Sequence, residues 1–136
     1  MDRRTRARRR IANTALAILK GEVSYLEGTR LILEDRGPAE LPDDDPDITA
    51  FALIESETEN LPFASRRQHW SREALESKAA EVRRAEEWAR RTAEREARSF
   101  IRRFGGLTER SVASPELDLV GRRTFFDDYP DNVKTA

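Results

Sequence analysis

One long series of regularly spaced apolar residues constrains the fold of this chain more than any other feature. From Leu75 to Phe104 the apolar positions recur at intervals that average about 3.6 residues, the period of an α-helix. Ser71 precedes the run as a candidate N-cap, and two glycines follow it. The sequence therefore predicts one long helix over 71–104. Its apolar stripe consists of Leu75, Ala79, Val82, Ala85, Ala89, Ala93, Ala97, Phe100 and Phe104.

A second apolar stripe lies near the start of the chain. It runs from Ala12 to Leu33 with a period near 3.5 residues, and glycines interrupt it, the first at Gly21. Ser24 and Glu27 have the spacing of a capping box, so a new helix can begin there. Either one kinked helix or a hairpin of two helices fits this pattern.

The middle of the chain predicts a loop, a short helix and a turn. Residues 37–47 contain three prolines and no apolar periodicity, as expected of a loop. Asp47 is a candidate cap for the following helix, and Ser65 with Gln68 for a short turn. We expect helices near residues 5–20, 23–36, 47–57 and 71–104, and the turn at 65–70.

These elements predict an all-α fold, a small bundle of about four helices with one long C-terminal helix. We divide the chain into a basic arm at 1–10, a helical domain at 11–104 and an extended tail at 105–136. The predicted core consists of Leu16, Leu19, Val23, Leu26, Phe51, Ile54, Leu75, Val82, Trp88 and Phe100.

Composition excludes most catalytic and metal-binding classes. The chain has no cysteine, which rules out disulfides, thiolate metal sites and thiol nucleophiles. Its one histidine, His69, has no partner acid or nucleophile at a defined spacing, and we interpret it as a residue of a helix junction. No phosphate-binding glycine motif is present. We therefore predict a protein that is not an enzyme and needs no cofactor or metal.

Two acidic patterns resemble metal sites without completing them. Asp43, Asp45 and Asp47 have the spacing of the first ligands of an EF-hand, but isoleucines occupy the positions that need glycine and glutamate. Glu73 and Glu76 form one acidic pair of the all-α pyrophosphohydrolase type, and no suitable second pair follows. Both patterns are more typical of solvated helices and loops.

Charge is strongly segregated along the chain, although the formal net charge is only −1. Residues 34–60 contain ten Asp or Glu and one Arg, a net charge of −9. Such a block favours association with a basic protein surface. We predict an interaction protein of immunity-like, adaptor or regulatory type. The partner-binding residues would be Asp43, Asp44, Asp45, Asp47, Glu55, Glu57 and Glu59.

An alternative function comes from the arginine-rich start of the chain. Six arginines in the first ten residues could neutralise several phosphates of a nucleic acid. No aromatic residue for base stacking lies near them, and the whole chain is not basic, so this is the second hypothesis. The candidate contacts are Arg3, Arg4, Arg6, Arg8, Arg9 and Arg10.

The tail carries three aromatic residues beside acidic ones. Phe125, Phe126 and Tyr129 would be costly to leave in water together. We expect them to dock on the helical body or on a second chain, which would make a homo-oligomer. No segment has the roughly 20 apolar residues of a membrane span, and the Arg-rich start lacks the features of a signal peptide. We therefore expect a cytoplasmic protein without membrane contact.

Two stretches resemble those of small bacterial helical proteins of unknown function. They are residues 18–30, ILKGEVSYLEGTR, and residues 56–62, SETENLP, with Trp70 and Trp88 beyond them. The resemblance covers residues 11–104 and implies a bacterial, cytoplasmic, helical protein. It implies no activity.

Overall fold

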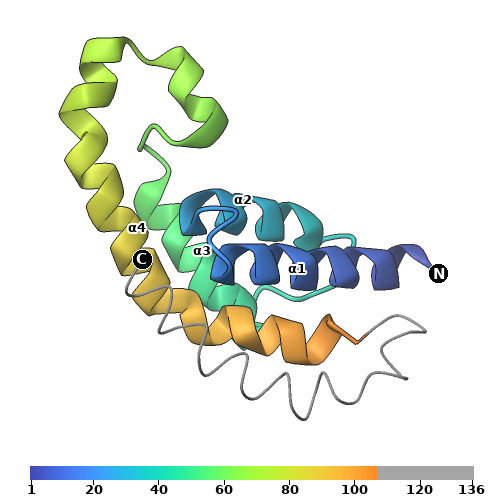
Figure 1. Ribbon diagram of the computed structural model, residues 1–136. Coiled ribbons are helices and arrows are strands. Elements are labelled where there is room, and N and C mark those ends of the chain that lie inside the picture. The colour runs from blue at the N-terminus through green and yellow to red at the C-terminus, as the bar shows by residue number, and fades with distance from the viewer. Residues whose placement is uncertain (107–136) are drawn as a thin grey trace.

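The structure is a computed structural model that describes residues 1–106. The predicted docking aromatics Phe125, Phe126 and Tyr129 lie outside the described residues. The described part is helical and contains no strand, which confirms the all-α prediction (Figure 1). Its elements are α1 (Arg3–Leu19), α2 (Tyr25–Arg36), α3 (Pro46–Thr58), the 3-10 helix η1 (Ala64–His69) and α4 (Arg72–Phe104).

A tight turn makes α1 and α2 a hairpin rather than one kinked helix. Gly21 has a φ of 77°, a left-handed conformation that glycine adopts without strain. Ser24 caps α2, since its hydroxyl accepts a hydrogen bond of 3.0 Å from the Glu27 backbone N–H. A Cβ on Gly28 would lie 2.2 Å from Ile18 Cδ1, so the two helices approach each other where a side chain is missing.

Two of the predicted caps are wrong. Asp45, not Asp47, caps α3, because Pro46 fits the first helical position and the Asp45 carboxylate accepts the N–H groups of Asp47 and Ile48 at 3.0 and 3.3 Å. The short helix η1 follows Phe63 and has no side-chain cap, so Ser65 does not serve as one. Ser71 caps α4 as predicted, with its hydroxyl 3.0 Å from the Ala74 N–H.

The core lies where α1, α2 and α3 pack against the C-terminal half of α4. Phe51 of α3 stacks on Phe100 of α4 with ring centroids 5.8 Å apart. Leu19, Leu26, Phe51, Ile54 and Phe100 are buried as predicted, whereas Leu16, Val23, Val82 and Trp88 are only partly buried. The buried face of α1 consists of Ala7, Ile11, Ala12, Ala15, Ile18 and Leu19.

Only half of the predicted stripe on α4 belongs to this core. At about 1.5 Å per residue α4 is roughly 50 Å long, about twice the length of α1. Figure 1 shows its first half extending beyond the three other α-helices, with η1 beside it. Leu75 is therefore only half-buried and Ala79 is exposed. The prediction that Leu75 belongs to the core is wrong, because none of the other α-helices within residues 1–106 covers this part of α4.

The basic segment 1–10 is continuous with the helical body, since α1 begins at Arg3. No helix among residues 1–106 is both long and apolar enough to cross a membrane.

Candidate functional site

The acidic block divides between the two ends of α3, which are about 20 Å apart. At the N-terminal end, Asp45 and Asp47 are buried and only Asp43 and Asp44 are exposed. At the C-terminal end, Glu55 is half-buried, and Glu57 and Glu59 are exposed. The seven predicted partner-binding carboxylates therefore do not form one surface.

The N-terminal end of α3 is tied to α4 by a polar cluster. One Arg103 nitrogen lies 2.7 Å from an Asp45 oxygen, and the other lies 2.7 Å from Asp47 Oδ2. The Ser99 hydroxyl donates to the same Asp47 oxygen at 2.6 Å. The guanidinium also lies over the Phe104 ring, 4.7 Å from its centroid. Both carboxylates are thus occupied by contacts within the chain.

Opposing effects set the pKa of Asp45. Burial acts to raise it, but hydrogen bonds from Arg103 and from the backbone of Ile48 and Asp47 act in the other direction. The net pKa lies below the ordinary value of 3.8, so this carboxyl is ionised in the folded chain at neutral pH. Its charge is balanced internally and is not available to a partner.

The two exposed acids of the preceding loop form a small site of their own. Asp43 has a 90% exposed side chain and accepts a hydrogen bond of 2.6 Å from Arg36 at the end of α2. Asp44 makes no ion pair with residues 1–106. This loop therefore presents one free and one partly neutralised carboxylate.

Arg66 of η1 organises the C-terminal end of α3. Its guanidinium donates to the carbonyl oxygens of Thr58 and Glu59 at 3.1 and 3.0 Å, and to Glu55 at 3.4 Å. It lies 4.3 Å from the centroid of the Phe63 ring. A cation at this position satisfies the last carbonyls of the helix and complements its dipole. Arg66 thus ties η1 to the end of α3, while Leu61 and Phe63 of the intervening loop are buried in the core.

A cleft opens between this end of α3 and the middle of α4. Its volume is about 270 Å³, and Leu61, Ala85 and Trp88 supply apolar lining. Glu57, from α3, and Glu81, from α4, also line it, together with Arg84. Glu81 has a lysine partner, Lys78, at 3.1 Å, whereas Glu57 has no ion pair in the described part of the chain. The cleft combines an apolar surface with two exposed carboxylates.

The described part of the chain holds no cluster of metal-ligating side chains. Within residues 1–106, no three His, Asp or Glu side chains lie close enough together to hold a metal ion. His69 is exposed on η1, and it does not line the cleft. The side chains at the cleft can bind a cation, form hydrogen bonds and exclude water from an apolar contact.

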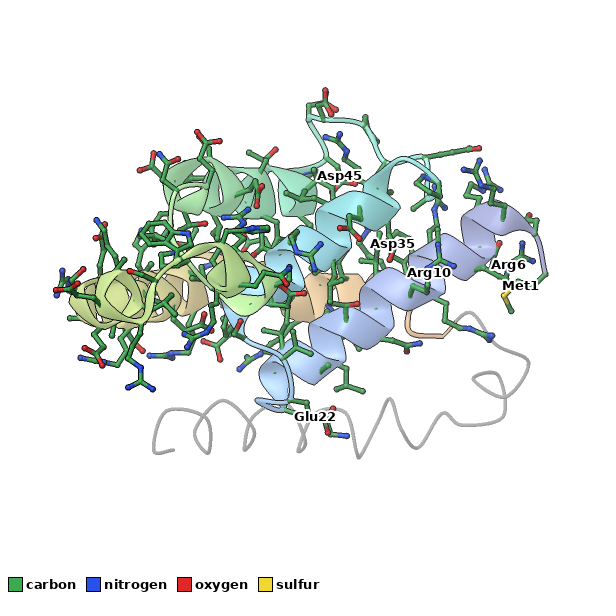
Figure 2. The ribbon with its side chains drawn as sticks, turned by 90° about the horizontal axis from the view of Figure 1, so that it is seen from above. Met1, Arg6, Arg10, Glu22, Asp35 and Asp45 are labelled. Atoms are coloured by element: carbon green, nitrogen blue, oxygen red, sulfur yellow. The ribbon has the colours of Figure 1, made fainter. Side chains whose placement is uncertain are left out.

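The predicted nucleic-acid contacts lie on α1, and half of them hold the body together. Arg8 donates to the Ala39 carbonyl at 2.9 Å and lies over Phe104, and Arg10 pairs with Asp35 of α2 at 2.9 Å (Figure 2). Arg4 is 3.6 Å from Glu40, an exposed pair. Arg6 donates to the backbone of Met1. Of the six, only Arg3 and Arg9 form no side-chain hydrogen bond, ion pair or ring contact with the described residues.

Sequence reasoning missed a partly buried acid on α4, Glu86. Both oxygens of the Glu86 carboxylate accept backbone N–H groups at the start of α2, one from Tyr25 and one from Leu26 at 3.2 Å. Burial raises the pKa of Glu86 above its ordinary value, and these two hydrogen bonds oppose the shift. In the sequence Glu86 stands among other glutamates and arginines, so no signal distinguished it.

Comparison of the chain with protein-family models, with curated proteins and with solved structures finds no match. The function is therefore argued from the geometry of these sites.

Proposed function

We propose that the chain is a non-enzymatic interaction protein that binds a basic surface of another protein at the cleft between α3 and α4. The observation that carries the proposal is the placement of Glu57 and Glu59 at the C-terminal end of α3. Acids there oppose the helix dipole and destabilise a helix slightly. Neither residue has a cation partner among residues 1–106, so their placement does not serve the fold.

The cleft fits an arginine or lysine side chain with its aliphatic stem. Leu61 and Trp88 offer apolar contacts for the stem, and Trp is the best aromatic partner for a cation. Glu57 and Glu81 lie at the same cleft and would pair with the charged group. The partner would thus insert a basic residue as an anchor in the cleft.

The remaining exposed acids would contribute to the approach of the partner. Asp43 and Asp44 lie at the far end of α3, where they add to the negative field but not to the cleft. Charges of this kind raise association rates at low salt more than they raise affinity. An immunity-like, adaptor or regulatory role in the bacterial cytoplasm is consistent with this surface.

Titration with a hexa-arginine peptide, followed by tryptophan fluorescence, tests the proposal. A Trp70→Phe background leaves Trp88 at the cleft as the only tryptophan. We expect saturable binding that Glu57→Gln with Glu81→Gln weakens at least tenfold. The matched control, Asp43→Asn with Asp44→Asn, removes the same charge from the other end of α3 and should weaken binding less than threefold. Equal effects of the two pairs would show that charge alone, and not the cleft, attracts the peptide.

Capture of partners from a bacterial lysate extends the same comparison to natural ligands. We expect the wild-type chain and the Asp43→Asn, Asp44→Asn variant to retain the same partner at moderate salt, while the Glu57→Gln, Glu81→Gln variant loses it. Asp45 and Asp47 are left unchanged, because Arg103 depends on them. A partner retained equally by all three proteins would exclude the cleft as its binding site.

Nucleic-acid binding by α1 is a second candidate. It is favoured by the position of α1, whose N-terminal end lies beside the C-terminal end of α4, where Arg8 packs on Phe104. Arg3, Arg9 and Arg102 carry no ion pair with residues 1–106, so their charges are available to phosphates. A mobility-shift titration of duplex DNA with the wild type and with an Arg3→Gln, Arg9→Gln, Arg102→Gln variant tests it. No binding by the wild type at low salt would exclude this function.

A further inference from the structure

A second cavity lies between η1 and the first turns of α4. Its volume is about 370 Å³, and its lining residues are Arg67 on η1 and Arg72, Leu75, Glu76 and Ala79 on α4. It is separate from the cleft at Trp88, with which it shares no lining residue. Leu75 and Ala79 supply its apolar lining, and its charged lining consists of two arginines and one glutamate, so it is basic on balance.

This cavity belongs to the part of α4 that extends beyond the other α-helices (Figure 1). Leu75 and Ala79 continue the stripe that is buried further along the helix, yet here they are half-buried and exposed. Neither Arg67 nor Arg72 forms an ion pair with any residue in the described part of the chain. An apolar lining and two unpaired cations together suit a ligand that is both aromatic and acidic.

We propose that this cavity binds the segment Phe125–Tyr129 of the same chain. The segment reads FFDDY, so it combines three aromatic rings with two carboxylates. The rings would cover Leu75 and Ala79, while Asp127 and Asp128 would pair with the arginines. The other cleft is a poor site for this segment, because Glu57 and Glu81 would repel its carboxylates.

The length of the chain permits this contact within one molecule. From Leu75 to Phe104 α4 rises by roughly 44 Å, at about 1.5 Å per residue. The 18 residues between Gly106 and Phe125 span up to about 60 Å when extended at about 3.3 Å per residue. The segment can therefore return along α4 as far as η1.

Disulfide trapping tests the contact directly in the full chain, because the chain has no cysteine of its own. We expect Ala79→Cys combined with Thr124→Cys to form an intramolecular disulfide at least tenfold faster than a matched control pair. The control is Arg95→Cys with Thr124→Cys, since Arg95 is also exposed on α4 but lies away from the cavity. Equal rates for the two pairs, or disulfides only between two chains, would overturn the proposal.

A charge exchange provides a second and independent measurement. Introducing Arg67→Glu and Arg72→Glu into the trapping variant should slow disulfide formation at least fivefold, and adding Asp127→Arg and Asp128→Arg should restore it. As a control, Arg83→Glu with Arg95→Glu changes the same charge at exposed positions of α4 outside the cavity and should leave the rate unchanged. A rate that falls equally in both charge variants, or that the exchange fails to restore, would contradict pairing at the cavity.

Discussion

Both ends of α3 are acidic, and each is bound by an arginine from another element. The two arginines bind different groups. At the N-terminal end Arg103 binds the carboxylates of Asp45 and Asp47. At the C-terminal end Arg66 donates mainly to the carbonyl oxygens of Thr58 and Glu59, and the Glu57 and Glu59 side chains remain exposed. A segment rich in acidic residues therefore contains carboxylates that are paired within the fold and others that remain exposed to a partner. The position of the neighbouring arginine determines which carboxylates are paired.

The helix dipole makes the same distinction. Acids near the start of a helix are stabilised by its N–H groups, whereas acids in its last turn face carbonyl oxygens. Asp45 gains two backbone hydrogen bonds from this arrangement. Glu57 gains none. We infer that Asp45 raises the free energy of unfolding and that the acids at the C-terminal end of α3 lower it slightly. Four predictions test this difference.

The largest effect is expected for Asp45→Ala. It removes the cap of α3 and takes one carboxylate from Arg103 in a partly buried ion pair, and the two losses together cost about 3 kcal/mol. Urea unfolding should show this decrease in the free energy of unfolding. Asp44→Ala, one residue earlier and exposed, should change it by less than about 0.5 kcal/mol. Similar values for the two variants would mean that the cluster does not stabilise the fold.

The contribution of Asp45 should depend on pH. Because its folded pKa is lowered, its ionised form contributes stability that is complete above the unfolded pKa of 3.8 and is lost as the pH falls through the folded value. The difference in unfolding free energy between the wild type and Asp45→Asn should therefore be constant near neutral pH and shrink below pH 3.8. Chemical unfolding at several pH values measures it, and a constant difference down to strong acid would refute the assignment.

A smaller loss is expected for Arg66→Ala at the other end of α3. Two of its hydrogen bonds go to backbone carbonyls, one part-buried at Thr58 and one exposed at Glu59, so we expect a decrease of about 1 kcal/mol in the free energy of unfolding. Arg83→Ala is the matched control, because Arg83 is exposed on α4, lines neither cavity and has no ion pair with residues 1–106. Thermal unfolding of both variants measures the difference. A loss as large as that of Asp45→Ala would make the two ends of α3 equivalent.

The smallest effect, of opposite sign, is expected for Glu57→Gln with Glu59→Gln. Removing two acids near the end of a helix should raise the free energy of unfolding by about 0.3–0.5 kcal/mol. Asp43→Asn with Asp44→Asn, which removes the same charge near the start of α3, should lower it slightly or leave it unchanged. Differential scanning calorimetry at low salt resolves such shifts. A decrease in the Glu57, Glu59 variant would show that these acids are structural.

Local sequence signals predicted the helices well. Periodicity, Ser24 and Ser71 gave bounds within about two residues of those observed for the four α-helices, because a cap and its helix are close in the chain. Asp45 was missed as a cap because Asp43, Asp44 and Asp47 offered the same chemistry nearby. Several acids in one loop leave the choice of cap to Pro46 and to the packing of the helix.

Partners that are distant in the sequence could not be predicted. Asp45 and Arg103 are 58 residues apart, and the long helix offers many arginines that are equivalent in the sequence. The stripe on α4 shows the same limit, because periodicity identifies the apolar face but not the neighbour that covers it. Ala93 is buried by such a neighbour, whereas Ala79 is exposed. The cleft was not predicted either, since Glu81 and Trp88 come from a different helix than Glu57.

The cap that Glu86 provides for α2 has a consequence for how the chain folds during synthesis. Glu86 and Tyr25 are 61 residues apart, and α1 packs extensively on α4. The hairpin of α1 and α2 therefore gains its cap and buries its apolar face only when α4 packs on it. While a ribosome is still making α4, the hairpin of α1 and α2 exposes its apolar face and lacks this acceptor. Contacts between such distant segments form slowly, so the packing of the hairpin on α4 takes place after α4 has been synthesised. The nascent chain must therefore avoid aggregation until α4 has emerged from the ribosome.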